Sequence, residues 1–66
     1  MNRDDVINEL NNGKEIYYKD FDVIIYQYKN NYYMYKIKGD GTGVTLGVID
    51  LTQDLNWENM KIKIDW

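Results

Sequence analysis

The hydrophobic pattern of this chain changes from helical to alternating at the polar turn Asn11-Asn12-Gly13, and that change constrains the fold more than any other feature. Three apolar residues ahead of the turn have the spacing of one helix face: Val6, Ile7 and Leu10. Asn2 and Asp5 resemble a capping box, and Gly13 can take the left-handed conformation that ends many helices. The sequence therefore predicts one short helix over about residues 3–12.

After the turn, apolar and polar residues alternate, as they do in strands that are half buried in a sheet. The predicted strands are residues 14–18, 21–28, 32–38, 44–49 and 60–66. The last is the most regular, with Met60, Ile62, Ile64 and Trp66 on one side. We predict a single domain over residues 1–66 of the α+β class, in which one short N-terminal helix packs on a twisted antiparallel sheet of roughly four to five strands.

Two further expectations concern the fourth strand and the segment after it. The strand is expected to carry its aliphatic residues on one face: Val44, Leu46 and Val48. In the following segment, Asp50 is expected to cap a single helical turn that carries Leu51 and Leu55.

All seven tyrosines lie between residues 17 and 39. The strand predicted at 21–28 is apolar on both faces, yet a single short helix can cover only one face of a sheet. The core face is expected on its side with Phe21, Val23 and Ile25. A tyrosine ring tolerates burial while its hydroxyl stays in water, so we expect Tyr26 and Tyr28 on the face opposite the helix.

The next turn decides which tyrosines join them. With a two-residue loop at Asn30-Asn31, Tyr28 faces Tyr33 across the hairpin. Tyr26 then faces Tyr35, and four tyrosines share the open face. Asn tolerates the positive φ that this loop requires, which favours this arrangement.

A three-residue loop at residues 29–31 is the alternative. A slip of one residue reverses every side chain of a strand. Tyr32 and Met34 would then join Tyr26 and Tyr28, and the other tyrosines of that strand would enter the core.

The tyrosine cluster has two interpretations, and both stay open. Cross-strand aromatic pairs stabilise a sheet by about 0.2–1 kcal/mol each, and this alone would account for the cluster. An exposed aromatic patch is also typical of protein interfaces, where Tyr is enriched among the residues that contribute most to binding. A homodimer formed through this face would satisfy both interpretations.

The charge is unevenly distributed. The net charge of −3 argues against direct binding to nucleic acid. No Lys or Arg lies between Gly39 and Met60. The acidic residues of this stretch are Asp40, Asp50, Asp54 and Glu58. They form either an ordinary solvated surface or an acidic surface that docks on a basic site of another protein.

The residue types of common catalytic and metal sites are missing. The chain has no His, Cys or Ser, which excludes Ser–His and Cys–His nucleophilic catalysis and disfavours zinc. Asp20 and Asp22 fit turn and surface roles better than a glycosidase pair. The loop at residues 39–43 lacks the spacing of a phosphate-binding loop. We predict no enzyme and no catalytic, cofactor-binding or metal-binding residues.

Nothing in the sequence predicts membrane insertion. No uninterrupted apolar run is longer than that of residues 23–26, which is far below the roughly 20 residues needed to cross a bilayer. The first ten residues lack the apolar stretch of a signal peptide. The expected location is the cytoplasm.

The chain opens with a short helix that ends in Leu10-Asn11-Asn12-Gly13-Lys14, followed by a strand at Glu15-Ile16-Tyr17-Tyr18. It closes on a tryptophan-containing strand, NWENMKIKIDW. In these features it resembles small proteins of phages and mobile elements from AT-rich bacteria, which include anti-defence proteins that sequester cyclic nucleotide signals. The resemblance implies a mobile-element setting, in which small acidic proteins act as stoichiometric inhibitors, as anti-CRISPR proteins do. For a phage-encoded chain, the expected location is the host cytoplasm.

We therefore expect a non-enzymatic interaction protein that inhibits a host protein concerned with defence or with nucleic acids. Its expected binding residues are Tyr26, Tyr28, Tyr33, Tyr35 and the four acids of the 40–58 stretch. Two alternatives stay open. One is a protein that binds or sequesters a small nucleotide-type ligand. The other is a weak binder of single-stranded nucleic acid, with Lys29, Lys36 and Lys38 on the phosphates.

Overall fold

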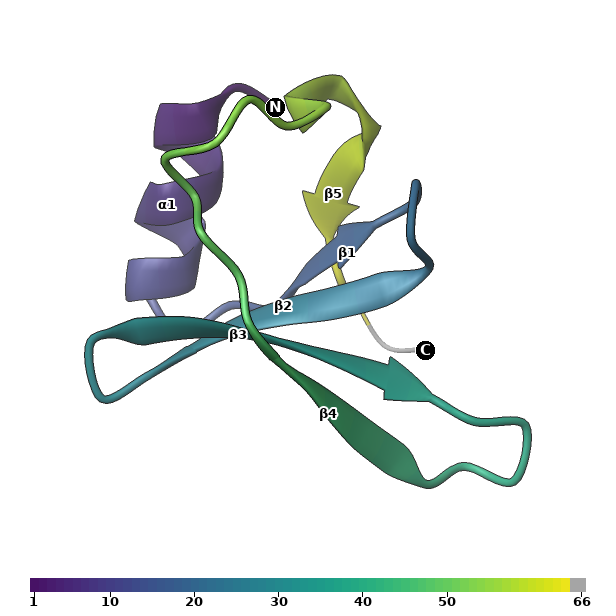
Figure 1. Ribbon diagram of the computed structural model, residues 1–66. Helices are drawn as coiled ribbons and strands as arrows, with labels where there is room; N and C mark the ends of the chain where they lie inside the picture. The colour runs from purple at the N-terminus through teal and green to yellow at the C-terminus, as the bar shows by residue number, and fades with distance from the viewer. Residues whose placement is uncertain (65–66) are drawn as a thin grey trace.

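A computed structural model describes residues 1–64 of the chain (Figure 1). The elements are α1 (Arg3–Asn11), β1 (Ile16–Tyr18), β2 (Val23–Tyr28), β3 (Asn31–Ile37), β4 (Gly43–Val48), the 3-10 helix η1 (Trp57–Asn59) and β5 (Met60–Ile62). The strands form one antiparallel sheet in the order β4-β3-β2-β1-β5. The predicted α+β class, with one short N-terminal helix on an antiparallel sheet, is confirmed.

Strand β5 was predicted over residues 60–66 but ends at Ile62, so it is shorter than predicted. The part of that prediction that falls on Asp65 and Trp66 lies outside the described residues. Neither helix in the described part of the chain has the length and apolar character needed to cross a membrane.

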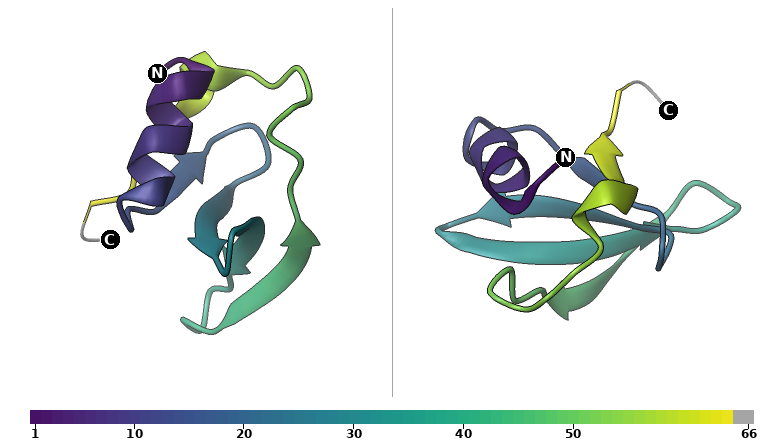
Figure 2. Two further views of the ribbon diagram at one scale, coloured as in Figure 1. Left: turned by 90° about the vertical axis from the view of Figure 1, so that its left-hand side faces the viewer. Right: turned by 90° about the horizontal axis from the view of Figure 1, so that it is seen from above.

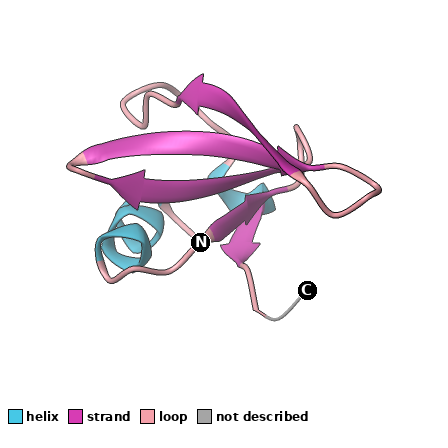
Figure 3. Ribbon diagram, turned by 90° about the horizontal axis from the view of Figure 1, so that it is seen from below, coloured by secondary structure: helices cyan, strands magenta, loops and turns pink. Residues whose placement is uncertain are grey.

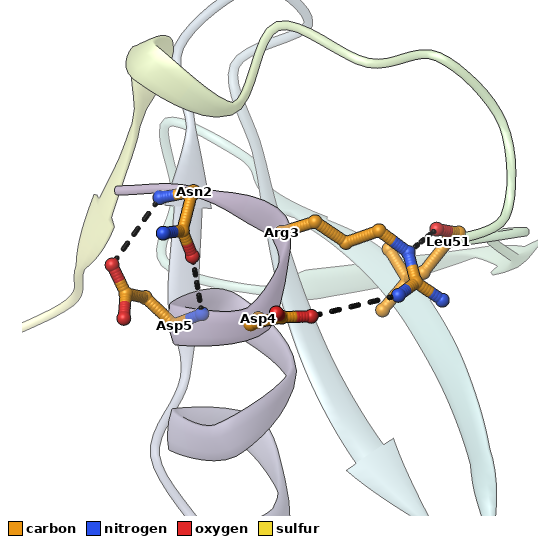
Figure 4. A network of polar contacts seen from close by, with 5 residues as sticks. All are labelled: Asn2, Arg3, Asp4, Asp5 and Leu51. Carbon is orange, nitrogen blue, oxygen red and sulfur yellow. Dashed lines mark hydrogen bonds and ion pairs between the residues drawn. The ribbon is translucent and has the colours of Figure 1, made fainter.

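Hydrogen bonds fix both ends of α1. Asn2 Oδ1 accepts the Asp5 N–H at 2.8 Å, and Asp5 Oδ2 accepts the Asn2 N–H at 3.3 Å, which completes the capping box (Figure 4). Gly13 follows the helix with φ 83°, a conformation that glycine adopts without steric cost. Arg3 Nε donates to the Leu51 carbonyl at 2.8 Å and ties the first turn of α1 to the segment after β4.

The core lies between α1 and one face of the sheet. Val6 and Leu10 of α1 are fully buried there, and the segment between β4 and η1 closes the same side (Figure 2). The other buried members are Ile16, Tyr18, Val23, Ile25, Ile49, Leu51 and Met60. Phe21 was expected among them, but its side chain is 62% exposed. The reason is that β2 begins at Val23, so Phe21 belongs to the preceding turn.

The β2–β3 hairpin turns on Lys29 and Asn30, whose φ angles are 47° and 67°. The register pairs Tyr28 with Asn31, Tyr26 with Tyr33 and Ile24 with Tyr35. The predicted loop at Asn30-Asn31 is wrong by one residue, because Lys29 and Asn30 together supply the positive φ angles of a two-residue hairpin turn. This displacement shifts the pairing by two residues, so every side chain keeps its predicted face. Tyr32 and Met34 accordingly pack against the core.

Strand β4 contains an irregularity that the sequence did not reveal. Between Thr45 and Gly47 the register with β3 shifts by one residue, which leaves Leu46 as a bulge. A bulge inverts the alternation of side chains, so Val44 and Val48 lie on opposite faces of the sheet. The prediction that the three aliphatic residues of this strand share a face is therefore wrong. Gly47 has φ 124°, which glycine accepts without a clash at Cβ.

The segment after β4 forms a turn in place of the predicted helical turn. Asp50 Oδ1 accepts the Thr52 N–H at 2.9 Å and the Thr52 hydroxyl at 2.6 Å. Such side-chain bonds to nearby backbone compete with helix formation. Leu51 is buried, and Leu55 packs against the core. The helical turn comes later, as η1.

The capping box gives a first test of this fold. We expect Asn2→Ala to lower the free energy of unfolding by about 1 kcal/mol, because the Asp5 N–H loses its acceptor. Urea denaturation measures this difference. Asn8→Ala is the matched control in the middle of α1, where alanine should keep or slightly raise the stability. An equal loss in both variants would contradict the capping role of Asn2.

Candidate functional site

The sheet face opposite α1 carries a connected cluster of aromatic rings. We call Tyr26, Tyr28, Tyr33 and Tyr35 the tyrosine face. The Tyr26 and Tyr33 rings stack with centroids 5.7 Å apart, and Tyr35 meets Tyr26 edge-on at 5.5 Å. The tilted Tyr28 ring lies 6.5 Å from that of Tyr33. The structure thus brings together the four tyrosines that the sequence predicted for this surface.

The tyrosine face is accessible but unequally so. Tyr28 is 54% exposed at the end of β2, whereas the other three side chains are half-buried. The buried residues of α1 and of the segment after β4 belong to the core on the other side. Seen from below, both helices lie behind or beside the strands (Figure 3). The rings contact one another on this face, whereas α1 packs on the other side of the sheet.

Two residues beside the tyrosine face, on the same side of the sheet, were not among the predicted site residues. They are Tyr17 and Ile24. Ile24 pairs with Tyr17 on one side and with Tyr35 on the other, and it is only 3% exposed. Together with Asp22 and Ile37, these two residues line an open hollow of about 270 Å³. The sequence could have indicated the position of Tyr17. Side chains alternate along β1, so Tyr17 lies on the sheet face opposite the buried Ile16 and Tyr18.

Lysine side chains lie against the rings at two ends of this face. Lys29 Nζ is 5.3 Å from the centroid of the Tyr28 ring, and Lys61 Nζ is 5.8 Å from that of Tyr17. Such cation–π contacts contribute about 0.5–1 kcal/mol at exposed sites. Of the lysines expected to meet phosphates, Lys29 is on this face, whereas Lys36 lies on the helix side.

Tyr35 is held in place from the turn that precedes β1. Its hydroxyl donates to Glu15 Oε1, and Glu15 Oε2 lies 3.7 Å from Lys63 Nζ. Burial, with help from this hydrogen bond and the Glu15 charge, raises the pKa of Tyr35 from 10.0 to about 12. The fold therefore favours the neutral phenol, and this contribution to stability is complete below pH 10 and lost as the pH rises through 12. At neutral pH Tyr35 is an oriented hydrogen-bond donor.

The acids predicted for a second surface do not form one patch. They are Asp40, Asp50, Asp54 and Glu58. Asp40 lies in the β3–β4 turn and Glu58 in η1, at opposite ends of the molecule (Figures 1 and 2). Hydrogen bonds from Thr42 and Thr52 lower the pKa of Asp40 and Asp50, respectively. Both carboxylates thus stabilise their own turns.

Asp20 and Asp22 act as hydrogen-bond acceptors in the β1–β2 turn. Asp22 Oδ1 accepts the Tyr17 hydroxyl at 2.8 Å, and this bond raises the pKa of Tyr17. Asp20 accepts the side-chain amides of Asn56 and Asn59, the first of which is the main cause of its lowered pKa. Asp20 thereby fastens η1 to the turn, which is a structural role.

Within residues 1–64, no three carboxylates come close enough together to hold a metal ion. Comparison with models of known families, with curated proteins and with solved structures found no match to this chain. Function is therefore inferred from the geometry of the tyrosine face.

The Asp20 bonds predict a pH-dependent stability. The folded pKa of Asp20 lies below its ordinary value of 3.8, so its stabilising contribution is present above pH 3.8 and is lost as the pH falls through the folded pKa. We expect Asp20→Asn to lower the melting temperature at neutral pH. The gap to the wild type should narrow as the pH falls below 3.8.

Melting temperatures followed by circular dichroism from neutral to acidic pH measure this gap. Asp54→Asn is the matched control, because Asp54 is an exposed acid outside the turn. Its curve should run parallel to that of the wild type. A gap for Asp20→Asn that stays constant with pH would contradict the proposed role of the carboxylate.

Proposed function

We propose that this protein is a non-enzymatic binding protein that docks a partner protein on the tyrosine face. The observation that supports this function is the set of four contacting tyrosine rings on the sheet side that α1 leaves open. Each ring offers apolar carbon for burial and a hydroxyl for a hydrogen bond at the rim of an interface.

The ring contacts also favour binding through entropy. The Tyr26 ring already touches two others, and Tyr35 is fixed by Glu15. Side chains that are ordered before binding lose less conformational freedom when a partner arrives. Tyr28 is the most exposed ring and the first that a partner would meet.

The size of the adjacent hollow favours a protein partner over a small ligand. Pockets for small molecules usually enclose about 300–1,000 Å³ and cover most of the ligand. The hollow beside Ile24 measures only about 270 Å³ and is open to one side. A protein side chain fits such a space better than a nucleotide does.

We further propose that the partner is a host protein and that occupancy of its surface inhibits it, as the resemblance to small mobile-element proteins implies. Inhibition of this kind requires one copy of the protein for each target and no chemical step. The acids at residues 40–58 lie outside the tyrosine face, so they would act by attracting a basic partner over distance. Charges placed in this way mainly raise the association rate.

A second candidate is the binding of single-stranded nucleic acid on the same face. Lys29 and Lys61 lie beside rings at two ends of the face, where they could meet backbone phosphates. The stacked contact of Tyr26 with Tyr33 argues against it, because it occupies ring surface that a base would need.

Substitution of Tyr28, the most exposed ring of the tyrosine face, tests the proposed function. The immobilised wild type is used to capture proteins from a lysate of the organism carrying the gene. We expect immobilised Tyr28→Ala to capture much less of them, since the partner loses the most exposed ring of the tyrosine face. Phe21→Ala is the matched control, because it removes an exposed aromatic side chain that lies beside Val23 and Met34, on the other side of the sheet. Circular dichroism of both variants checks that the fold is intact.

Three results would contradict the proposal. Capture that is equal for the wild type and Tyr28→Ala would exclude the tyrosine face as the docking surface. Binding of a labelled oligothymidylate that weakens steeply with salt would favour the nucleic-acid candidate. A wild-type dimer in sedimentation that Tyr28→Ala dissociates would assign the face to self-association.

A further inference from the structure

The two edges of the sheet differ in how well they are protected against pairing with another strand. Exposed edges are usually short or carry Lys or Pro, which discourage an added strand. Edge strand β5 has three residues, includes Lys61 and is followed by Lys63. Edge strand β4 has six residues, Gly43–Val48, none of them charged and none proline.

The hydrogen bonds of the β3–β4 hairpin show which groups of β4 face outward. Lys38 N–H bonds to the Thr42 carbonyl at 2.8 Å. Bonding residues alternate along an antiparallel strand, so the backbone groups of Gly43 and Thr45 point away from β3. The bulge at Leu46 interrupts this spacing. An added strand would therefore pair first with Gly43 and Thr45, on the hairpin side of the bulge.

Apolar side chains flank this edge on both faces of the sheet. On the helix side, a hollow of about 480 Å³ is lined by Phe21, Val23, Met34, Lys36 and Leu46. Leu46 is 52% exposed there. On the tyrosine side, Val48 and Ile37 are exposed. Alternate side chains of an added strand would thus lie beside apolar surface on each face.

The charges near β4 indicate which kind of strand would bind to this edge. Asp40 precedes β4 and Asp50 follows it, so an acid lies at each end of the edge. The neighbouring lysines, Lys36 and Lys38, belong to β3 and to the residue after it, one strand further from an added strand. An added strand with Lys or Arg at both ends would therefore be attracted to this edge. A second copy of the chain is disfavoured, because antiparallel pairing about the centre of β4 places Asp50 of each copy close to Asp40 of the other.

We propose that β4 accepts an extended segment of a partner protein as an additional strand, and that this segment has β-branched residues in its centre and basic residues at its ends. Backbone hydrogen bonds to Gly43 and Thr45 hold the segment, and its alternate side chains contact the apolar margins. This site lies on the sheet edge and does not depend on the tyrosine face.

Three capped synthetic peptides test the proposal: KRTVTVTRK, the acid-flanked EDTVTVTDE and the interrupted KRTVPVTRK. Amide exchange of the full chain is followed by NMR. At about 1 mM peptide we expect KRTVTVTRK to slow exchange at the Gly43 and Thr45 N–H groups by about tenfold or more. EDTVTVTDE should bind about tenfold more weakly at low salt, with a difference that shrinks as salt is added. KRTVPVTRK should leave the Gly43 and Thr45 amides unprotected. Its proline has no N–H to donate to a carbonyl of β4, so the peptide cannot pair as a strand.

Substitution of Thr45 assigns the effect to the edge. Thr45→Pro removes an outward N–H without breaking a bond to β3, so we expect peptide protection at Gly43 to disappear. Thr45→Val keeps the donor and should retain the protection. If Thr45→Pro loses its dispersed amide spectrum, Thr45→Lys replaces it, because lysine at an edge also opposes pairing and here repels the basic peptide.

Four results would overturn the proposal. Exchange at Gly43 and Thr45 that is unchanged by KRTVTVTRK would exclude strand addition, and equal protection by EDTVTVTDE would exclude the charge preference. Protection confined to Tyr28 and Tyr33 would place the peptide on the tyrosine face and would support only the proposed function. A peptide-free dimer in sedimentation, dissociated by Thr45→Lys, would make a second copy the occupant.

Discussion

The packing of α1 against one side of the sheet is the interaction on which the rest of the structure depends. Val6 and Leu10 are fully buried there, and the helix as a whole meets mainly β1, β2 and β5. A chain of this size has a thin margin of stability, and a single helix of nine residues has little apolar surface to offer. The opposite sheet face and the β3–β4 end therefore remain outside the helical cover (Figure 1). Both candidate binding surfaces follow from this shortage of covering structure.

The uncovered face is stabilised by its own side chains. Ile24 is almost completely buried although no helix lies over it, because Tyr17 and Tyr35 flank it on the neighbouring strands. Aromatic rings suit this position, since they shield one another and keep their hydroxyls in water. Under the proposed function, the contacts that stabilise this face are the same ones that form the docking surface. A partner that binds here meets a surface that the fold already requires.

Local patterns predicted the elements and the faces of this fold but not its irregular positions. The change of pattern at Gly13 and the capping residues located α1, and the alternation of β2 placed Tyr26 and Tyr28 correctly. The hairpin loop was misplaced because Lys29 adopts a positive φ that lysine seldom takes. The bulge at Leu46 and the bond from Arg3 to Leu51 depend on tertiary contacts that no short stretch of sequence encodes. For the same reason the acids at 40–58 formed a group in sequence and not in space.

The pairing of β1 with β5 has a consequence for how the chain assembles. Strands β2, β3 and β4 follow one another along the chain and pair through short turns, so their contacts close small loops. Ile16 pairs with Ile62, which requires the two ends of the chain to meet. Loops of that length close at a higher entropic cost and appear later in folding. The topology therefore favours early formation of the tyrosine hairpin and late closure of the core by the C-terminal strand. During synthesis, the ribosome must release almost the entire chain before that closure can occur.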